Sequence, residues 1–412
     1  MPQAFPTAEE ILADRARREP ARVALHWLER RLCLGRLAAL AGEWALFLAR
    51  MAPEGRPIGF VLTETPALVA LVLAGWHAGR TMVPLAADLA DAELARRMRL
   101  SAPGLIIAHE EHLERTRAAA RSCRNPPAIA VLRGQTLRPD TRAKGAARAG
   151  SARRTDVALH AWTERTGPAR AALLTHANIV ASALRVAAAR THSPGETVLC
   201  TRPPSDAIVL VSDVIAPLLA GGLVGIVSGQ GREALLHALD AGRPALLTLG
   251  ESGLDALLGG LPERSLRSLR RLVVRVEALP RTVLRRLQDA LPEAAILRAW
   301  GYAETAGDVL LARGDTLARK PDGLGPPHPG VLVCALAPDG HVLGARRPGV
   351  IALRGSMVMR GYHRDSSATR QVLQDGWFRT PDLGYIDDEG EVILTATGSA
   401  QAASTTGPVR DR

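Results

Sequence analysis

The sequence predicts an α/β protein with two helix-covered, mostly parallel sheet subdomains packed together and a small C-terminal antiparallel β subdomain. Three observations lead to this fold class. Up to about residue 320, short apolar segments alternate with segments whose apolar residues recur at helical spacing. Beyond it, short strand-like segments are joined by Asp-Gly and Glu-Gly turns, which are typical of antiparallel pairing. The 412 residues also allow about two or three packed units with a continuous core.

The first predicted unit covers residues 1–200. Thr7 and Glu10 form a capping-box pattern before its first helix, and residues 34–51 repeat apolar side chains at helical spacing. Predicted strands and helices then alternate at 58–64, 65–80, 81–85, 91–102 and 104–109. The Arg-rich stretch at about 133–156 has little periodicity, so we interpret it as an exposed basic loop, a solvated insertion rather than a phosphate-tracking surface.

The alternation resumes after this loop and defines a second α/β unit at residues 201–320. Segments at 156–162, 175–192 and 196–201 lead into this unit. Within it, strands and helices are predicted at 212–221, 223–228, 231–242, 245–250, 272–279, 280–291 and 295–301. The small β unit is expected at residues 321–395. Residues 396–412 have no apolar face and are predicted to form a disordered tail.

Composition narrows the possible partners and the setting. Lys and Arg number 52 against 41 Asp and Glu, a net charge of +11 that would suit a polyanionic partner. Arg dominates that charge in an Ala- and Arg-rich chain, so we interpret it as a compositional habit and expect no nucleic-acid binding. The four cysteines are scattered singly, which argues against a disulfide framework or zinc site. Because no signal sequence and no run of about 18 apolar residues is present, we expect no membrane span and a cytoplasmic protein.

The first candidate site segment is residues 163–176, which we expect between a strand and a helix. Thr163, Thr166, Gly167 and Arg170 could offer hydroxyls, backbone amides and one cation to a phosphate chain, with the dipole of the following helix adding to them. The pattern is neither a Walker loop nor a dinucleotide fingerprint, so an ordinary strand-to-helix turn is the alternative interpretation.

Two further segments combine an aromatic or basic residue with a carboxylate. Trp300 offers a flat face to a base, and Glu304 offers an oxygen ligand to Mg²⁺, although a core Trp and a surface Glu would give the same pattern. Asp382, expected in a tight turn, could accept hydrogen bonds from two ribose hydroxyls, and Arg379 could bind a phosphate. An Asx cap is the alternative for Asp382.

Together and in this order, these segments resemble the adenylate-forming superfamily, specifically its large N-terminal domain. That superfamily comprises acyl-CoA synthetases, aryl-CoA ligases and the adenylation domains of peptide synthetases. The resemblance runs from about residue 8 to residue 394 and is closest at residues 348–394. It implies binding of ATP or AMP with Mg²⁺, and CoA or phosphopantetheine as a possible acceptor of the acyl group.

The resemblance assigns the phosphate loop to residues 163–171. Thr163 stands where Ser is usual, and Thr166 and Gly167 match the family pattern. Glu164 and Arg165 replace Gly and Thr, and Ala-Arg-Ala replaces Pro-Lys-Gly at positions 169–171. A carboxylate at position 164 would repel a polyphosphate, whereas the arginines at 165 and 170 would offset that repulsion. The resemblance implies that Thr166, Arg170 and Glu304 act in catalysis.

The other nucleotide motifs also depart from the family pattern. The adenine and magnesium motif is represented by Trp300, Gly301, Tyr302, Ala303 and Glu304, with Ala in place of Thr. In the ribose motif, residues 378–382, the Asp is intact and the Arg is present. Proline replaces its usual Gly, so we expect a reshaped turn.

On the acid side, the resemblance points to Asp206, Arg275, Val276 and Glu277. Arg275 and Val276 replace two glycines along which the substrate normally lies, so they would fill that space or demand an acidic or short substrate. The usual aromatic-His gate reads Ser-Asp at residues 205–206, and a long fatty acyl tunnel is not expected.

We expect neither the family's mobile lid domain nor its lysine here, because Ser399 replaces the hinge Arg and only a short tail follows. The resulting prediction is ATP-dependent adenylation of a small acyl or aryl acid toward a CoA or carrier-protein thioester. We expect this activity to be impaired or to need a lid domain in trans. The alternatives are an inactive member that binds a nucleotide or an acyl carrier protein, and a truncated product without a selected function.

Overall fold

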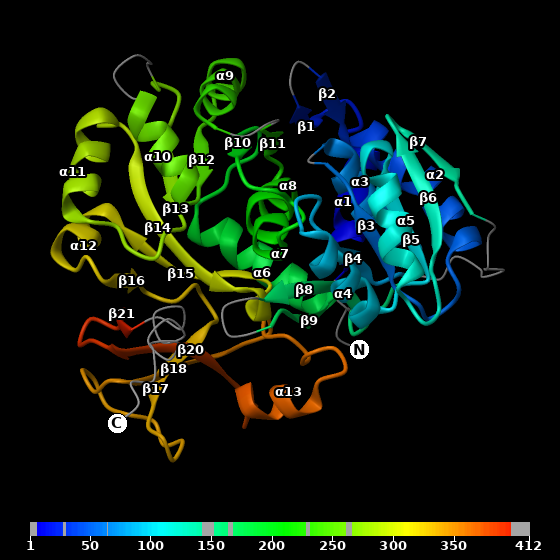
Figure 1. Cartoon of the computed structure of the whole chain (residues 1–412). Coiled ribbons are helices and arrows are strands. Elements are labelled where there is room, and N and C mark those ends of the chain that lie inside the picture. Colours follow the sequence, from blue (N-terminus) through cyan, green and yellow to red (C-terminus); the bar gives the residue numbers. More distant parts are fainter. Residues whose placement is uncertain are drawn as a thin grey trace, which may run out of the picture.

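The computed structural model describes residues 6–27, 30–63, 65–141, 152–163, 168–227, 231–260 and 266–396. In these ranges the strands form three sheets, two of them mostly parallel and covered by helices and the third small and antiparallel (Figure 1). This arrangement confirms the predicted fold class. Residues 397–412, where a disordered tail was predicted, lie outside the described residues.

The sheet nearest the N-terminus has the strand order β7-β6-β5-β3-β4-β8-β9. Its strands are β3 (Ile58–Val61), β4 (Met82–Pro84), β5 (Leu105–His109), β6 (Ala128–Arg133), β7 (Thr136–Pro139), β8 (Val157–Thr163) and β9 (Arg170–Thr175). The edge strands β7 and β9 are antiparallel to their neighbours. Strand β7 lies within residues 133–156, so the predicted basic loop is wrong for that part, and residues 142–151 lie outside the described residues.

The largest sheet has the order β15-β14-β13-β12-β10-β11-β1-β2. Its strands are β1 (Val23–Trp27), β2 (Arg30–Cys33), β10 (Thr197–Cys200), β11 (Leu223–Ile226), β12 (Leu246–Leu249), β13 (Arg271–Val274), β14 (Ala295–Tyr302) and β15 (Gly307–Arg313). Strands β1, β2 and β10 belong to the first predicted unit in sequence but pair within this sheet. The chain therefore crosses between the two α/β layers more often than the predicted boundary at residue 200 implies.

Several helices from both layers share one hydrophobic cluster, and the others pack in separate clusters. The helices are α1 (Ala8–Arg18), α2 (Leu34–Met51), α3 (Pro66–His77), α4 (Asp91–Ser101), α5 (Leu113–Arg121), α6 (His176–Ala189), α7 (Ala207–Val209), the π-helical η2 (Leu210–Ile215), α8 (Ala216–Ala220), α9 (Arg232–Gly242), α10 (Glu251–Gly260), α11 (Arg281–Ala290) and α12 (Gly314–Arg319). One buried cluster contains Trp76 of α3, Ile179 of α6 and Val214 of η2, and this shared core fixes the two layers against each other. The capping box of α1 is present, with Thr7 Oγ1 accepting from the Glu10 amide at 3.2 Å.

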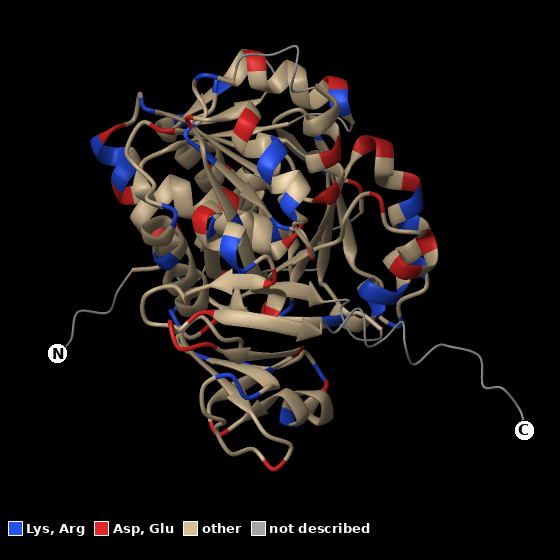
Figure 2. Ribbon diagram, turned by 90° about the vertical axis from the view of Figure 1, so that its left-hand side faces the viewer, with Lys and Arg blue, Asp and Glu red and all other residues tan. Residues whose placement is uncertain are grey.

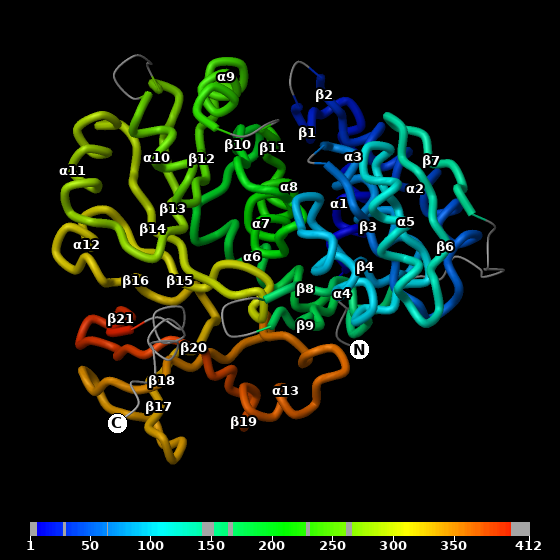
Figure 3. The backbone as a smooth tube through the Cα atoms, in the orientation of Figure 1, coloured from blue at the N-terminus to red at the C-terminus, as the bar shows by residue number. Residues whose placement is uncertain are grey.

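The small sheet has the order β16-β21-β20-β18-β17, with β19 beside β20. Its strands are β16 (Gly323–Gly325), β17 (Leu332–Leu336), β18 (Gly349–Arg354), β19 (Leu373–Gln374), β20 (Trp377–Ile386) and β21 (Val392–Ala396), and α13 (Ser366–Val372) precedes β19. The chain between β18 and α13 runs along the edge strand β9, where Leu173 N donates to Gly361 O at 2.8 Å and His363 N donates to Ala171 O at 2.8 Å. Figure 3 shows this part of the chain beneath β8 and β9, so the small sheet is joined to both layers.

Charges of both signs cover the helices. Figure 2 shows Lys and Arg interleaved with Asp and Glu along the helices. One such pair, in α4, joins Arg96 to Glu93 at 2.6 Å. No helix in the described ranges is long and apolar enough to cross a membrane.

Candidate functional site

The end of strand β14 carries most of the predicted nucleotide residues. Residues 300–302 complete this strand, and the short 3-10 helix η4 (Ala303–Thr305) turns the chain into the antiparallel β15. Gly301 is required by this turn, because a Cβ added there would lie 2.3 Å from the carbonyl oxygen of Gly307. Its smallness is therefore explained by the close approach of β15, independently of any nucleotide.

Four of the predicted residues line one cavity of about 280 Å³. They are Thr163 at the end of β8, Tyr302 at the end of β14, Glu304 in η4 and Arg379 in β20. Arg379 has a buried Nε with no hydrogen-bond partner among the described residues. A buried, unpartnered guanidinium N–H is costly unless an anion or water satisfies it. This cavity therefore offers an anion-binding group beside a carboxylate and a hydroxyl.

Glu304 is almost completely buried, and Tyr362 donates its hydroxyl to Glu304 Oε1 at 2.6 Å. Burial and the nearby negative charge of Glu304 raise the pKa of Tyr362 well above its usual range, so the phenol remains a donor. No group of three potential metal ligands occurs in the described part of the chain. A lone carboxylate is nevertheless compatible with Mg²⁺, which is usually held by one or two carboxylates together with substrate phosphates and water.

Asp382 is not in a tight turn, as the sequence had suggested, but in the middle of strand β20. Its side chain is fully buried, and its Oδ2 accepts hydrogen bonds from the Tyr302 hydroxyl at 2.6 Å and the Trp300 Nε1 at 3.3 Å. Burial and the Asp382 charge raise the pKa of Tyr302 well above its ordinary value. Protein donors thus occupy the carboxylate that was predicted to hold the ribose.

Trp300 is also less accessible than a stacking platform requires. It is 5% exposed, and the Arg298 guanidinium lies 5.6 Å from the centroid of its ring. It does line a second cavity of about 290 Å³ together with Gly301. The predicted acid-side residues Arg275, Val276 and Glu277 line the same cavity.

The predicted strand and helix flank residues 163–176, because β8 ends at Thr163 and α6 begins at His176, but an unpredicted strand, β9, occupies residues 170–175 between them. Thr163 ends β8 and Arg170 begins the antiparallel β9, where the two residues are register partners. Arg170 Nε contacts Asp365 Oδ2 at 3.1 Å, and its guanidinium lies 5.9 Å from the Tyr362 ring centroid. Thr166 and Gly167, with residues 164–165, lie outside the described residues.

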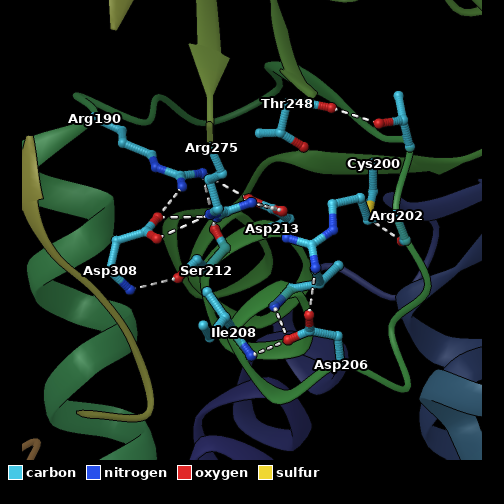
Figure 4. Close-up of polar contacts among 12 residues, drawn as sticks. Arg190, Cys200, Arg202, Asp206, Ile208, Ser212, Asp213, Thr248, Arg275 and Asp308 are labelled. Carbon is cyan, nitrogen blue, oxygen red and sulfur yellow. Dashed lines mark hydrogen bonds and ion pairs between the residues drawn. The ribbon is translucent and has the colours of Figure 1, made fainter. Parts of the chain in front are cut away.

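Arg275 is engaged with other side chains and is not an open cation for substrate. Its guanidinium contacts Asp213 Oδ2 at 2.6 Å and Asp308 Oδ1 at 2.9 Å, and Arg190 contacts both carboxylates (Figure 4). Although burial alone would raise it, the charges of Arg275 and Arg190 hold the pKa of Asp308 well below its usual range. These four residues, which we term the Arg–Asp cluster, form a buried network with zero net charge.

Sequence reasoning missed three members of the Arg–Asp cluster. Asp213 and Asp308 each stand alone in apolar segments, VLVSDVIA and GDVLLA, and a charge in such a run is the signal that could have found them. Asp206, predicted in the substrate pocket, caps α7 by accepting from the Ile208 amide at 2.8 Å. It also pairs with Arg202 at 2.7 Å and lines a broad groove of about 1170 Å³.

The comparisons with known proteins agree with this architecture. The family model described as AMP-binding enzyme matches residues 12–363, and the chain belongs to that family. It is 28% identical over 359 residues to a feruloyl-CoA synthase of an Amycolatopsis species, covering 86% of this chain and 70% of the relative. It is 27% identical over 235 residues to 4-coumarate–CoA ligase-like 4 of Oryza sativa subsp. japonica, a match that covers 56% of this chain and 42% of that relative.

Solved structures show the same fold at lower sequence identity. The anthranilate CoA ligase AuaEII, in complex with anthranoyl-AMP, has a TM-score of 0.86 at 19% identity, with 96% of this chain and 78% of that chain covered. The O-succinylbenzoate coenzyme A synthetase of Bacillus subtilis, in complex with AMP, has a TM-score of 0.81 at 20% identity, with 94% of this chain and 78% of that chain covered.

Proposed function

We propose that this chain is an ATP-dependent ligase that converts a small carboxylic acid into its adenylate. The acyl group would then pass to the thiol of CoA or of a carrier-protein phosphopantetheine. The family membership and the CoA-ligase names of the relatives support the reaction class. The anthranoyl-AMP bound to one structural neighbour is the kind of intermediate that we propose.

The observation that carries the proposal is the buried, unpartnered Nε of Arg379, a residue that lines one cavity together with Thr163 and Glu304. A phosphate oxygen would satisfy this N–H through a charge-assisted hydrogen bond. Glu304 is placed to hold Mg²⁺, which would neutralise phosphate charge when bound. We assign Thr163, Thr166, Gly167 and Arg170 to the phosphates, Tyr302 to the adenine and Asp382 to the ribose. Trp300, which is nearly buried and lines the other cavity with Gly301, would position Tyr302 and Asp382 through its Nε1.

The proposed chemistry has two steps. A carboxylate oxygen of the acid forms a bond to the α-phosphorus while the bond from that phosphorus to the bridging oxygen breaks, and pyrophosphate leaves with the electron pair. The thiolate of the acceptor then attacks the acyl carbon, and AMP leaves. Arg170 and Arg379 would act by stabilising charge on the transferred phosphoryl group.

A second candidate function is a nucleotide- or carrier-binding module without catalysis. The burial of Asp382 beneath Tyr302 and Trp300 favours it, because the ribose hydroxyls would have to replace existing donors. Activity could also require a further domain, on this or another polypeptide. Such a domain would correspond to the part of the solved relatives that lies outside the matched region, since the chain covers 78% of the Bacillus synthetase.

ATP–pyrophosphate exchange with a panel of aryl, short acyl and amino acids tests these candidates. Each reaction is run alone and with the C-terminal domain of a relative added. We expect exchange with at least one acid, its loss in Glu304→Gln and Arg379→Gln, and its retention in Arg285→Gln, a control at an exposed helix position. AMP binding without exchange supports the module, and absence of both overturns both candidates.

A further inference from the structure

The Arg–Asp cluster holds Arg275 in one position. The Arg275 Nη1 and Nη2 atoms contact Asp213 at 2.6 and 2.8 Å, and its Nε and Nη2 contact Asp308 at 2.9 Å each. Arg190, Asp213 and Asp308 have fully buried side chains, and the Arg275 side chain is 8% exposed. A planar guanidinium bound through all three nitrogens to two fixed carboxylates has no freedom to swing aside.

Arg275 lies where two cavities meet. It lines the cavity of about 290 Å³ that contains Trp300, and it also lines a larger one of about 640 Å³ beyond the ends of strands β10 to β13. Arg202 and Glu251 line both cavities as well. Glu251 is exposed, and Arg202 is partly exposed and pairs with Asp206 at 2.7 Å. Arg275 is therefore the fixed part of the boundary between the two spaces.

The smaller cavity adjoins the proposed reaction site, because Trp300 and Gly301 line it. Tyr302, the next residue along the chain, and Glu304 line the cavity of Arg379. An acid whose carboxylate reacts near Glu304 could place its side chain there. Its volume of about 290 Å³ lies at the lower end of the range of about 300–1,000 Å³ for small-molecule sites. A longer chain that extended from this cavity into the larger one would have to pass Arg275.

We propose that Arg275 is a specificity-determining residue that separates the two cavities and limits the substrate to short acids. This inference rests on the proposed ligase function and deepens it. The limit is steric, because the side chain of Arg275 lies between the two cavities and the Arg–Asp cluster prevents it from moving. Removing the side chain while balancing the charge should join the two cavities and admit longer acids.

Two double variants separate volume from charge. Arg275→Gly/Asp308→Asn removes one positive and one negative charge and opens the space between the two cavities, whereas Arg275→Met/Asp308→Asn has the same charge and keeps that space filled. Both retain the pair of Arg190 with Asp213. Circular dichroism and thermal unfolding establish that each variant is folded before its binding is measured.

Binding is followed by saturation-transfer NMR with acetate, butyrate, hexanoate, octanoate and decanoate, without nucleotide. We expect the wild-type protein to bind the short acids and not decanoate. The glycine variant should bind decanoate at least about tenfold more tightly than the methionine variant, because several more methylene groups leave water. Equal decanoate binding by the two variants, or no gain in the glycine variant, overturns the proposal.

The wild-type series decides the question even if the glycine variant does not fold. Wild-type protein that binds decanoate as tightly as butyrate overturns the proposed limit, and a decline in affinity beyond the short acids supports it. Failure of the ligase proposal is distinguishable, because it appears as absence of pyrophosphate exchange in every variant, whereas this test reads acid binding alone.

Discussion

Replacing Tyr302 by Phe tests whether the phenol occupies the position of the ribose. Tyr302 is 1% exposed, donates to Asp382 at 2.6 Å, and packs edge-on against Phe378 with 5.6 Å between the ring centroids. Phenylalanine preserves this packing, so the change removes the hydrogen bond to the charged acceptor and the one that Trp300 Nε1 donates to the phenol oxygen at 3.0 Å, although Trp300 Nε1 keeps Asp382 as an acceptor at 3.3 Å. Such bonds contribute about 1.5–3 kcal/mol, and we expect the free energy of unfolding to fall by that amount.

The same hydrogen bond would compete with a nucleotide. If ribose hydroxyls must displace the Tyr302 phenol from Asp382, removing the phenol should strengthen AMP binding. The gain is bounded by the energy of the lost bond, about 10- to 100-fold in the dissociation constant. Isothermal titration calorimetry with AMP and urea unfolding measure the two effects, with Tyr385→Phe on the same strand as the matched control.

Two results would refute this reasoning. An unfolding free energy equal to that of wild type would show that the bond to Asp382 contributes nothing to stability. A loss of stability with AMP affinity no better than in Tyr385→Phe would mean that the phenol does not compete with the ribose. In that case Asp382 would act as an internal acceptor only.

Three further predictions concern stability. Arg275→Met alone should lower the free energy of unfolding by about 3–5 kcal/mol, because the carboxylates of Asp213 and Asp308 then share one arginine. Adding Asp308→Asn should restore most of this stability. Equal losses in the single and the double variant, measured by urea unfolding, would contradict the prediction. Burial lowers the pKa of His160 to about 3 and of His176 to about 4, whereas an unfolded histidine titrates near about 6.5. The unfolded state thus binds protons that the native state excludes. The free energy of unfolding should therefore be highest above about pH 6.5 and fall as the pH decreases toward 4 and then 3, by at most about 1.4 kcal/mol per pH unit per histidine. An unfolding free energy that does not change with pH over this range would contradict the prediction. Gly301→Ala should lower the melting temperature without any nucleotide, since its Cβ would meet backbone, and an unchanged value would restore a purely nucleotide-related role.

The sequence predicted the layers of the fold well because buried parallel strands are continuous apolar runs, and helices between them show a different period. The same logic missed β7, a polar edge strand with no apolar alternation. It also treated residues 163–176 as one connection from a strand to a helix; β8 and α6 do flank them, but the short run at residues 170–175 forms the additional strand β9.

Parts of the candidate site could not be predicted from local sequence patterns. Asp382 has the same parity as Phe378 along β20, so strand alternation would have predicted it on the buried face, had the segment been treated as one strand instead of a turn. The position of Arg275 was identified, but its partners Asp213 and Asp308 come from other elements. Such a pairing is set by the packing of the elements and has no local sequence pattern.

The ion pairs of Lys320 should affect how this protein reacts with amine-labelling reagents. It is one of two lysines in the chain, the other being Lys144. Its ammonium contacts Asp387 at 2.5 Å and Glu389 at 2.9 Å, and these hydrogen bonds raise the pKa of Lys320 well above its usual value. A protonated amine is a poor nucleophile, so acylating reagents should leave Lys320 unmodified, and almost all of the positive charge will persist as arginine after exhaustive amine modification.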